Sequence, residues 1–397
     1  MNIRKVLLLA PIFPYPPDDG SRLRTCQILK ILSNRFYVDL ITFYQQEDNL
    51  KEGLAYLRKL CRNIYYFPLP VFRKSLFNRF FVYYREPSIK KHISQIMVEN
   101  NYDIIQVEKI FMACYIDFKL FKDKILVIDS WGVDSKLTWQ KYKFESGFLR
   151  KIFNYIKYLI HKKQEIYWVK KFDFLISITD DHTNFYKKYL YNKNITEIPN
   201  SVDSSYFKKD YTIYEIEKNS LIFMGIMNFL PNIDAIKYFM KDIYPLIVKY
   251  VKIKLYIVGK NPADEIRKFS NDNIIVTGEV EDIKEYLFKS EIFISPIRIG
   301  SGLRNKIIQA MAASKPIVAT TESCEGLNVK NEKELLIADD PLSFAKAVLR
   351  LLYDEELKRK LATNAYNYAK QNYSEEIINK KWEEFYDQIL NSDNIKK

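Results

Sequence analysis

Apolar residues occur along this chain in short runs, and segments with apolar residues at helical spacing separate these runs. Such runs, bounded by Gly, Pro and charged residues, are typical of strands that helices cover on both faces. In the first half we expect strands at residues 5–10, 38–43, 64–69, 104–107, 125–129 and 174–178. In the second half we expect strands at residues 220–224, 254–258, 274–277, 292–296, 317–320 and 335–338. The pattern therefore predicts an α/β fold with doubly wound parallel sheets.

The length of 397 residues is more than one typical core holds and suits two domains. The charged run at residues 208–218 separates the two groups of expected strands and is the expected linker. We therefore predict an N-terminal domain at residues 1–205 and a C-terminal domain at residues 206–373, each with a Rossmann-like sheet. Helices are expected at residues 341–352 and 354–372, with a last helix at about 374–390.

A glycine-rich turn follows the expected strand 292–296 and leads into a helix. Gly300 and Gly302 flank Ser301 in this turn, and Arg304 and Lys306 follow in the first turns of the helix. Backbone N–H groups, a helix N-terminus and two cations at the carboxyl end of a strand would suit a phosphate. The alternative is a surface turn before an ordinary helix.

Polar residues also follow the expected strands of the first half. Gly20 ends a proline-rich loop after the first strand, where it lets backbone approach a ligand closely, and Arg22 is either a phosphate ligand or a solvated helix residue. Glu108 and Asp129 lie at the carboxyl ends of two later strands. They are candidates for contact with an acceptor, or else for capping the loops.

The segment 292–320 resembles the nucleotide-sugar signature of the retaining family-four glycosyltransferases. One branch of that family reads G-x-G-x-R-x-K-x-x-E-A-M-A, and Gly300, Gly302, Arg304 and Lys306 match it. Gln309 stands where relatives place the Glu that holds the ribose, and Ser301 stands where they place the Glu that contacts the sugar. The resemblance implies a GT-B fold, in which two Rossmann-like domains face an interdomain cleft and the last helix packs back on the N-terminal domain.

Three further segments resemble the same family. Residues 225–232 resemble a G-x-M-x-W-x-P-N loop, which implies donor contacts from Met227, Asn228 and Asn232. Residues 278–283 resemble a G-x-V-x-D loop, where Glu279 and Val280 would meet the nucleotide base through their backbone. Gly20 matches a glycine that lies against the donor diphosphate, and Arg22 and Leu303 complete the expected donor-binding set.

The resemblance implies an enzyme that moves a sugar from a nucleoside-diphosphate sugar to a hydroxyl acceptor with retention of the anomeric configuration. The acceptor would be a glycan or a lipid-linked saccharide, in bacterial polysaccharide biosynthesis. Arg304 and Lys306 would neutralise the leaving diphosphate, and Glu108 completes the expected catalytic set. Two alternatives stay open: a nucleotide-sugar epimerase of GT-B fold, and a non-catalytic basic binding protein whose donor motif has decayed.

No metal or other cofactor is expected. The sequence has no Asp-x-Asp cluster, and its four cysteines and three histidines lie far apart, which favours neither a metal site nor a disulfide framework. This cysteine usage predicts a reducing, cytoplasmic location.

The net charge of +13 permits an anionic partner, although a genome rich in AT would also enrich lysine. Two basic and aromatic stretches, residues 72–92 and 149–171, are typical either of binding to the inner face of an anionic membrane or of ordinary helices packed on a sheet. No nucleic acid is expected, because neither stretch fits a recognised binding motif.

Overall fold

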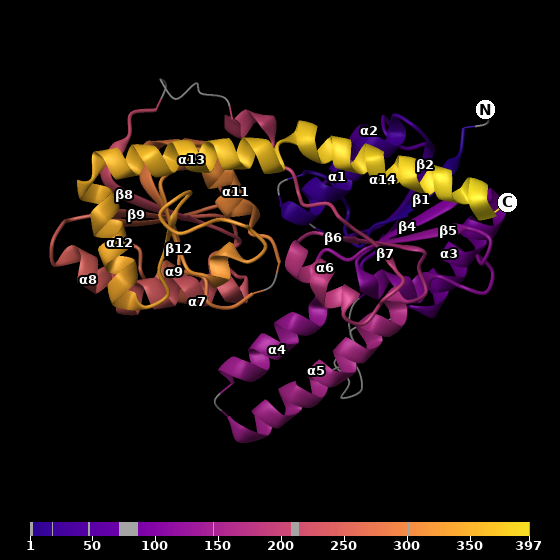
Figure 1. Cartoon of the computed structure of the whole chain (residues 1–397), viewed down its shortest axis with the longest axis horizontal. Helices are drawn as coiled ribbons and strands as arrows, with labels where there is room; N and C mark the ends of the chain where they lie inside the picture. Colours follow the sequence, from indigo (N-terminus) through magenta and orange to yellow (C-terminus); the bar gives the residue numbers. More distant parts are fainter. Residues whose placement is uncertain are drawn as a thin grey trace. The chain divides into compact units, whose positions relative to one another are not determined.

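The chain forms two compact units in the computed structural model, which describes residues 3–17, 19–46, 48–70, 86–145, 147–207, 214–300 and 302–396. Unit 1 comprises Met1–Asn200 and Asn379–Lys397, and unit 2 comprises Ser201–Ile378. Each unit is built on one sheet with helices around it (Figure 1). The chain therefore enters unit 1 twice.

The sheet of unit 1 has seven parallel strands in the order β3-β2-β1-β4-β5-β6-β7. The order runs outward from β1 in one direction and from β4 in the other, so the carboxyl ends of these two strands flank the topological switch point. The strands are β1 (Lys5–Leu9), β2 (Tyr37–Tyr44), β3 (Asn63–Pro68), β4 (Ile104–Glu108), β5 (Ile125–Asp129), β6 (Phe174–Ser177) and β7 (Asn194–Glu197).

Helices cover this sheet and bury its apolar side chains. Ile93 and Met97 pack with Ile105 of β4 in one buried cluster. Trp382 and Tyr386 are also fully buried, and the Tyr386 hydroxyl donates to Gln106 Oε1 at 2.7 Å. The helices are α1 (Gly20–Ser33), α2 (Leu50–Leu57), α3 (Pro87–Asn100), η2 (Ile110–Tyr115), α4 (Asp134–Phe144), α5 (Phe148–Val169), α6 (Asp180–Lys187) and the larger part of α14 (Glu375–Lys396).

The sheet of unit 2 has six parallel strands in the order β10-β9-β8-β11-β12-β13. They are β8 (Glu217–Met224), β9 (Lys254–Val258), β10 (Ile274–Gly278), β11 (Ser290–Ser295), β12 (Ile317–Ala319) and β13 (Leu336–Ile337). The helices are η3 (Ser204–Phe207), α7 (Leu230–Tyr238), η5 (Phe239–Ile243), α8 (Tyr244–Val248), α9 (Asp264–Arg267), α10 (Ile283–Lys289), α11 (Asn305–Ala312), η6 (Glu322–Cys324), α12 (Pro341–Tyr353) and α13 (Glu355–Tyr373).

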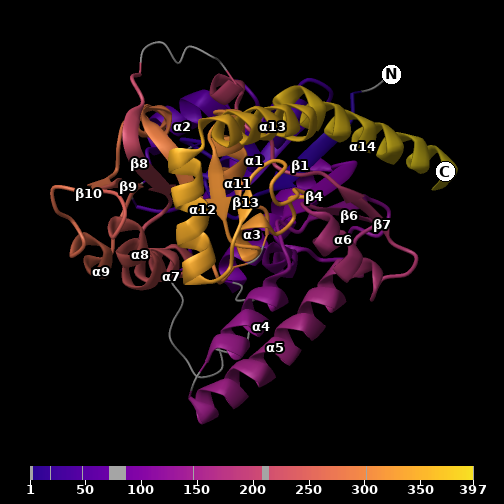
Figure 2. The ribbon, with the colours of Figure 1, turned by 60° about the vertical axis from the view of Figure 1, so that its left-hand side comes forward.

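The α/β fold with two doubly wound parallel sheets is confirmed. One strand of unit 1, β7, was not predicted, because it lies at the sheet edge and its residues are half-buried or exposed rather than continuously apolar. The basic stretch at residues 149–171 is the helix α5, which pairs with α4 in a hairpin that projects from unit 1 (Figures 1 and 2). Most of the other basic stretch lies outside the described residues.

Candidate functional site

The candidate donor site of unit 2 lies at the carboxyl ends of β8 and β11, which are neighbours in the sheet. The loop after β8 carries Asn228 and leads into α7, which carries Asn232. The loop after β11 carries Gly300 and Gly302 and leads into α11, which carries Lys306. Because the strands are adjacent and parallel, the two predicted loops meet at one edge of the sheet.

Lys306 and Asn232 converge on the backbone of Gly225. A Cβ atom added to Gly225 would lie 2.5 Å from Asn232 Nδ2 and 2.9 Å from Lys306 Nζ, so no larger residue fits without displacing them. The Asn232 amide is fixed, since Nδ2 donates to the Ile226 carbonyl oxygen at 2.9 Å. An ammonium group beside a glycine backbone is suited to holding an anion.

Arg304 folds back over the glycine-rich turn. A Cβ atom added to Gly300 would lie 2.3 Å from Arg304 Nη2, and the Gly300 φ of +147° is a conformation that favours glycine. Burial lowers the pKa of Arg304, and the carboxylates of Glu325 and Glu322 oppose this shift. The Glu322 Oε1 atom lies 3.9 Å from Arg304 Nη2.

Glu322 and Glu325 were not predicted as site residues. They follow β12, the strand next to β11, so the rule that ligands lie at the carboxyl ends of parallel strands could have indicated them. Their carboxylates favour the charged form of Arg304. The Lys306 ammonium group lies beside Gly225, at the start of the loop after β8.

The other predicted donor residues of unit 2 differ in accessibility. Met227 and Leu303 are buried, so their side chains belong to the core, whereas Asn228 and Glu279 are exposed and Val280 is half-buried. Gln309 is half-buried on α11, and among the described residues its side-chain amide has no hydrogen-bond partner. Ser301 lies outside the described residues.

The loops after β8, β9 and β10 are tied together at Gly259. A Cβ atom added there would lie 1.7 Å from the Gly225 carbonyl oxygen, and Gly259 φ is +145°. The Gly259 N–H donates to the Gly278 carbonyl oxygen at 3.2 Å. Gly278, with φ +71°, has open space at its Cβ position. The predicted base-binding loop is thus attached, through Gly259, to the loop after β8, against which Lys306 lies.

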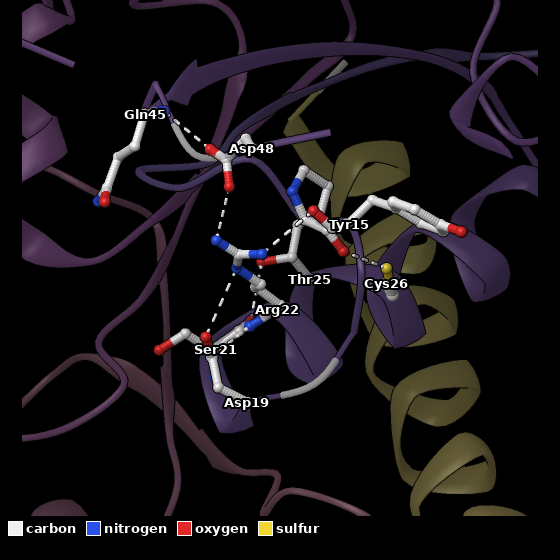
Figure 3. Close-up of polar contacts among 9 residues, drawn as sticks. Tyr15, Asp19, Ser21, Arg22, Thr25, Cys26, Gln45 and Asp48 are labelled. Carbon is white, nitrogen blue, oxygen red and sulfur yellow. Dashed lines mark hydrogen bonds and ion pairs between the residues drawn. The ribbon is translucent and has the colours of Figure 1, made fainter. Parts of the chain in front are cut away.

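In unit 1 the predicted Gly20 is the first residue of α1, and the carboxylate of Asp19 caps this helix (Figure 3). Asp19 Oδ1 accepts from the N–H groups of Ser21 at 2.8 Å and Arg22 at 3.0 Å. The Arg22 guanidinium donates to the Tyr15 carbonyl oxygen at 3.2 Å and to Asp48 Oδ1 at 2.7 Å. These contacts tie Arg22 to two loops of its own unit.

Glu108 is fully buried at the end of β4. Burial raises the pKa of Glu108 well above its usual range, and the nearby Asp129 carboxylate adds to the shift. The Thr25 hydroxyl lies 2.6 Å from Glu108 Oε2 and 3.2 Å from the Ser21 carbonyl oxygen. Of these two contacts, the hydrogen bond that the Thr25 hydroxyl donates to Glu108 opposes the rise in the Glu108 pKa. Glu108 thereby ties the end of β4 to α1.

Asp129 is held by Arg24, a buried residue of α1. Arg24 donates through Nε and Nη2 to the two Asp129 carboxylate oxygens at 2.6 and 3.0 Å, and through Nη1 to Asn200 Oδ1 at 2.9 Å. The Arg24 guanidinium also lies 5.2 Å from the ring centroid of Trp382. Both charged groups are buried, so the pair fixes the switch-point edge of the sheet.

Among the described residues, no group of three or more His, Cys, Asp or Glu side chains is placed to hold a metal ion. Within the same ranges, no helix has both the length and the hydropathy needed to cross a bilayer.

Comparison with known proteins points to one family. Residues 218–354 match the family model described as glycosyl transferases group 1. A relative from Klebsiella pneumoniae, described as an uncharacterized 44.6 kDa protein in the cps region, is 23% identical over 94% of this chain and 97% of its own length.

Two solved structures share the fold. Sucrose-phosphate synthase from Thermosynechococcus elongatus has a TM-score of 0.73 at 15% identity, over 98% of this chain and 100% of its own. HepE from Anabaena, in complex with UDP and glucose, has a TM-score of 0.68 at 12% identity, over 97% of this chain and 99% of its own. The solved structures therefore show the GT-B fold, and the match to group 1 glycosyl transferases covers residues 218–354.

Proposed function

We propose that this protein transfers a sugar from a nucleoside-diphosphate sugar to a hydroxyl group of a glycan or lipid-linked acceptor, with retention of the anomeric configuration. The observation that carries the proposal is the convergence of Lys306 and Asn232 on Gly225, within the matched segment 218–354. The cps-region relative and the UDP and glucose in HepE support a UDP-sugar as the first donor to test.

In this proposal the C1–oxygen bond to the diphosphate breaks, and the acceptor oxygen forms the new bond to C1 on the same face. The acceptor proton passes to the leaving phosphate oxygen. Lys306, Arg304 and the N-terminus of α11 stabilise the negative charge that grows on the diphosphate. Gln309 accepts from, and donates to, the ribose hydroxyls. No cofactor or metal takes part.

The decisive experiment measures donor binding and turnover by the purified chain. Thermal shift against UDP-, GDP- and ADP-sugars identifies the nucleotide, and nucleotide release in the presence of glycan acceptors measures transfer. A transferase releases nucleotide in step with acceptor glycosylation. Epimerised donor without acceptor would identify the epimerase alternative instead, and tight binding with no turnover would identify a binding protein.

Lys306→Ala tests the anion site directly. A lost charge-assisted hydrogen bond to phosphate should weaken donor affinity about 10- to 150-fold. Lys346→Ala is the matched control, because Lys346 is exposed on α12 of the same unit. Equal effects of the two substitutions on donor affinity would place the phosphate elsewhere.

Gln309 tests the placement of the ribose. Gln309→Glu should leave donor binding unchanged or tighter, because a carboxylate accepts from both ribose hydroxyls with charge assistance. Gln309→Ala should weaken binding by about 1 kcal/mol. Isothermal titration with the donor measures both, and unchanged affinity in both variants would move the ribose away from α11.

We also propose that the protein works in the cytoplasm. All four cysteines are free and buried, which suits a reducing compartment. Reducing and non-reducing electrophoresis of the protein isolated from its native host should give the same mobility, whereas a shift between the two would contradict this location.

A further inference from the structure

The hairpin of α4 and α5 exposes a row of large apolar side chains. It lies between β5 and β6 in the sequence. Both views of the ribbon show it projecting from unit 1 (Figures 1 and 2). Six large apolar side chains in residues 148–159 of α5 are 42–80% exposed: Phe148, Leu149, Ile152, Tyr155, Ile156 and Leu159. They recur at helical spacing, so they form one continuous face on the outer side of the helix. We call this set the apolar face of α5.

The hairpin does not need this apolar face to hold itself together. Its inner side is an aromatic stack, in which the Trp139 ring centroid lies 5.0 Å from those of Tyr142 and Tyr158. At its base, the Glu165 carboxylate accepts from the N–H groups of Asp134 and Ser135, both at 3.1 Å. Tyr155 also reaches the aromatic stack, since its ring centroid lies 5.3 Å from that of Tyr142. The other five side chains of the apolar face of α5 are not needed for the packing of α4. Exposed apolar side chains gathered on one face are typical of a docking surface.

The charges beside the apolar face indicate what it docks on. The segment from residue 147 to residue 164 contains five cations and no acidic residue: Arg150, Lys151, Lys157, Lys162 and Lys163. A second copy of the chain would bring these cations together, which repulsion disfavours. An anionic lipid surface neutralises them while its acyl region receives the apolar side chains. An apolar face on a helix segment whose only charges are positive therefore fits a membrane interface better than it fits a second copy.

We propose that the α4–α5 hairpin docks this protein on anionic membranes, with Phe148, Leu149 and Ile152 entering the interface and Arg150 and Lys151 contacting lipid phosphates. The proposal goes beyond sugar transfer and does not depend on it. Its charge component should be screened by salt, whereas the apolar component should persist.

Vesicle flotation of the full chain tests the proposal. The probes are vesicles of phosphatidylglycerol with phosphatidylcholine, and vesicles of phosphatidylcholine alone, at about 0.05 and 0.5 M salt. Binding to the anionic vesicles only, and weaker binding at high salt, is expected. Equal binding to both vesicle types, or to neither, would overturn the proposal.

Two variants identify the surface. Phe148→Ser, Leu149→Ser and Ile152→Ser combined should lower partitioning more than about tenfold. The matched control combines Leu342→Ser and Tyr353→Ser, which are 54% and 66% exposed on α12 of unit 2, and should bind as the original chain does. Equal partitioning of the triple variant and the control would overturn the proposal.

A charge variant tests the same surface independently, in case the triple variant is less stable than the original chain. Arg150→Gln with Lys151→Gln leaves the apolar face intact and should lower binding about fivefold for each charge removed at low salt. Unchanged binding of this variant would refute the proposal. Size-exclusion chromatography coupled to light scattering measures whether the protein forms a dimer. A dimer that the triple variant abolishes would assign the apolar face of α5 to self-association instead.

Discussion

Replacing Arg24 by methionine should destabilise unit 1 by about 3–5 kcal/mol, because it leaves the Asp129 carboxylate buried without its partner. Arg24 is 2% exposed and Asp129 is 0% exposed, so water cannot take the place of the guanidinium. The substitution removes both bonds to Asp129 and the bond to Asn200. Methionine keeps the length and an apolar contact with Trp382, so the loss reports mainly the buried ion pair.

Tryptophan fluorescence in urea measures this loss for unit 1 alone. All four tryptophans belong to that unit: Trp131, Trp139, Trp168 and Trp382. Arg35→Met is the control in the same unit, since Arg35 pairs with the exposed Asp387 and should cost under about 1 kcal/mol. Combining Arg24→Met with Asp129→Asn should recover stability, because no buried charge then remains. A cost below about 1 kcal/mol for Arg24→Met, or no recovery in the double variant, would refute the reasoning.

Further predictions concern pH, packing and metal. Burial raises the pKa of Glu165 to about 7 from 4.5, so its contribution to stability is full below pH 4.5 and is lost as pH rises to about 7. The free energy of unfolding of the original chain should therefore fall by up to about 3 kcal/mol over this pH range, and Glu165→Gln should abolish that fall. Urea unfolding of both proteins at several pH values in the range measures it. Gly225→Ala should cost about 1–3 kcal/mol in thermal unfolding, because the methyl group would meet Asn232 and Lys306; an unchanged melting temperature would contradict this crowding. EDTA should leave transferase activity unchanged, and activity restored only by a divalent cation would contradict the proposed metal-free reaction.

The strands could be predicted because their signal is local. The run at residues 125–129 matches β5 at both ends, since an apolar strand buried on both faces is continuous in sequence. The edge strand β7 has no such run, because one side of it faces no neighbouring strand. For α5, periodicity could not distinguish a face that packs on a sheet from one that meets solvent.

In the candidate site, too, only residues that lie close together in the sequence could be grouped in advance. Gly300, Arg304 and Lys306 fall within one turn and the helix that follows it, so spacing alone brought them together. Arg24 and Asp129 are 105 positions apart, and only the order of the sheet brings them into contact. The burial of Glu108, which raises its pKa, likewise depends on the fold and leaves no local signal in the sequence.

Unit 1 contains both the first and the last segment of the chain, and this determines the order in which the two units can be completed during translation. Residues 379–396 leave the ribosome after all of unit 2, yet they supply Trp382 against Arg24 and Tyr386 against Gln106. Until they emerge, the ion pair of Arg24 with Asp129 and the part of β4 around Gln106 lack this cover in the nascent unit 1. Unit 2 is continuous in sequence and can therefore mature first, so the half of the protein that is translated earlier is completed later.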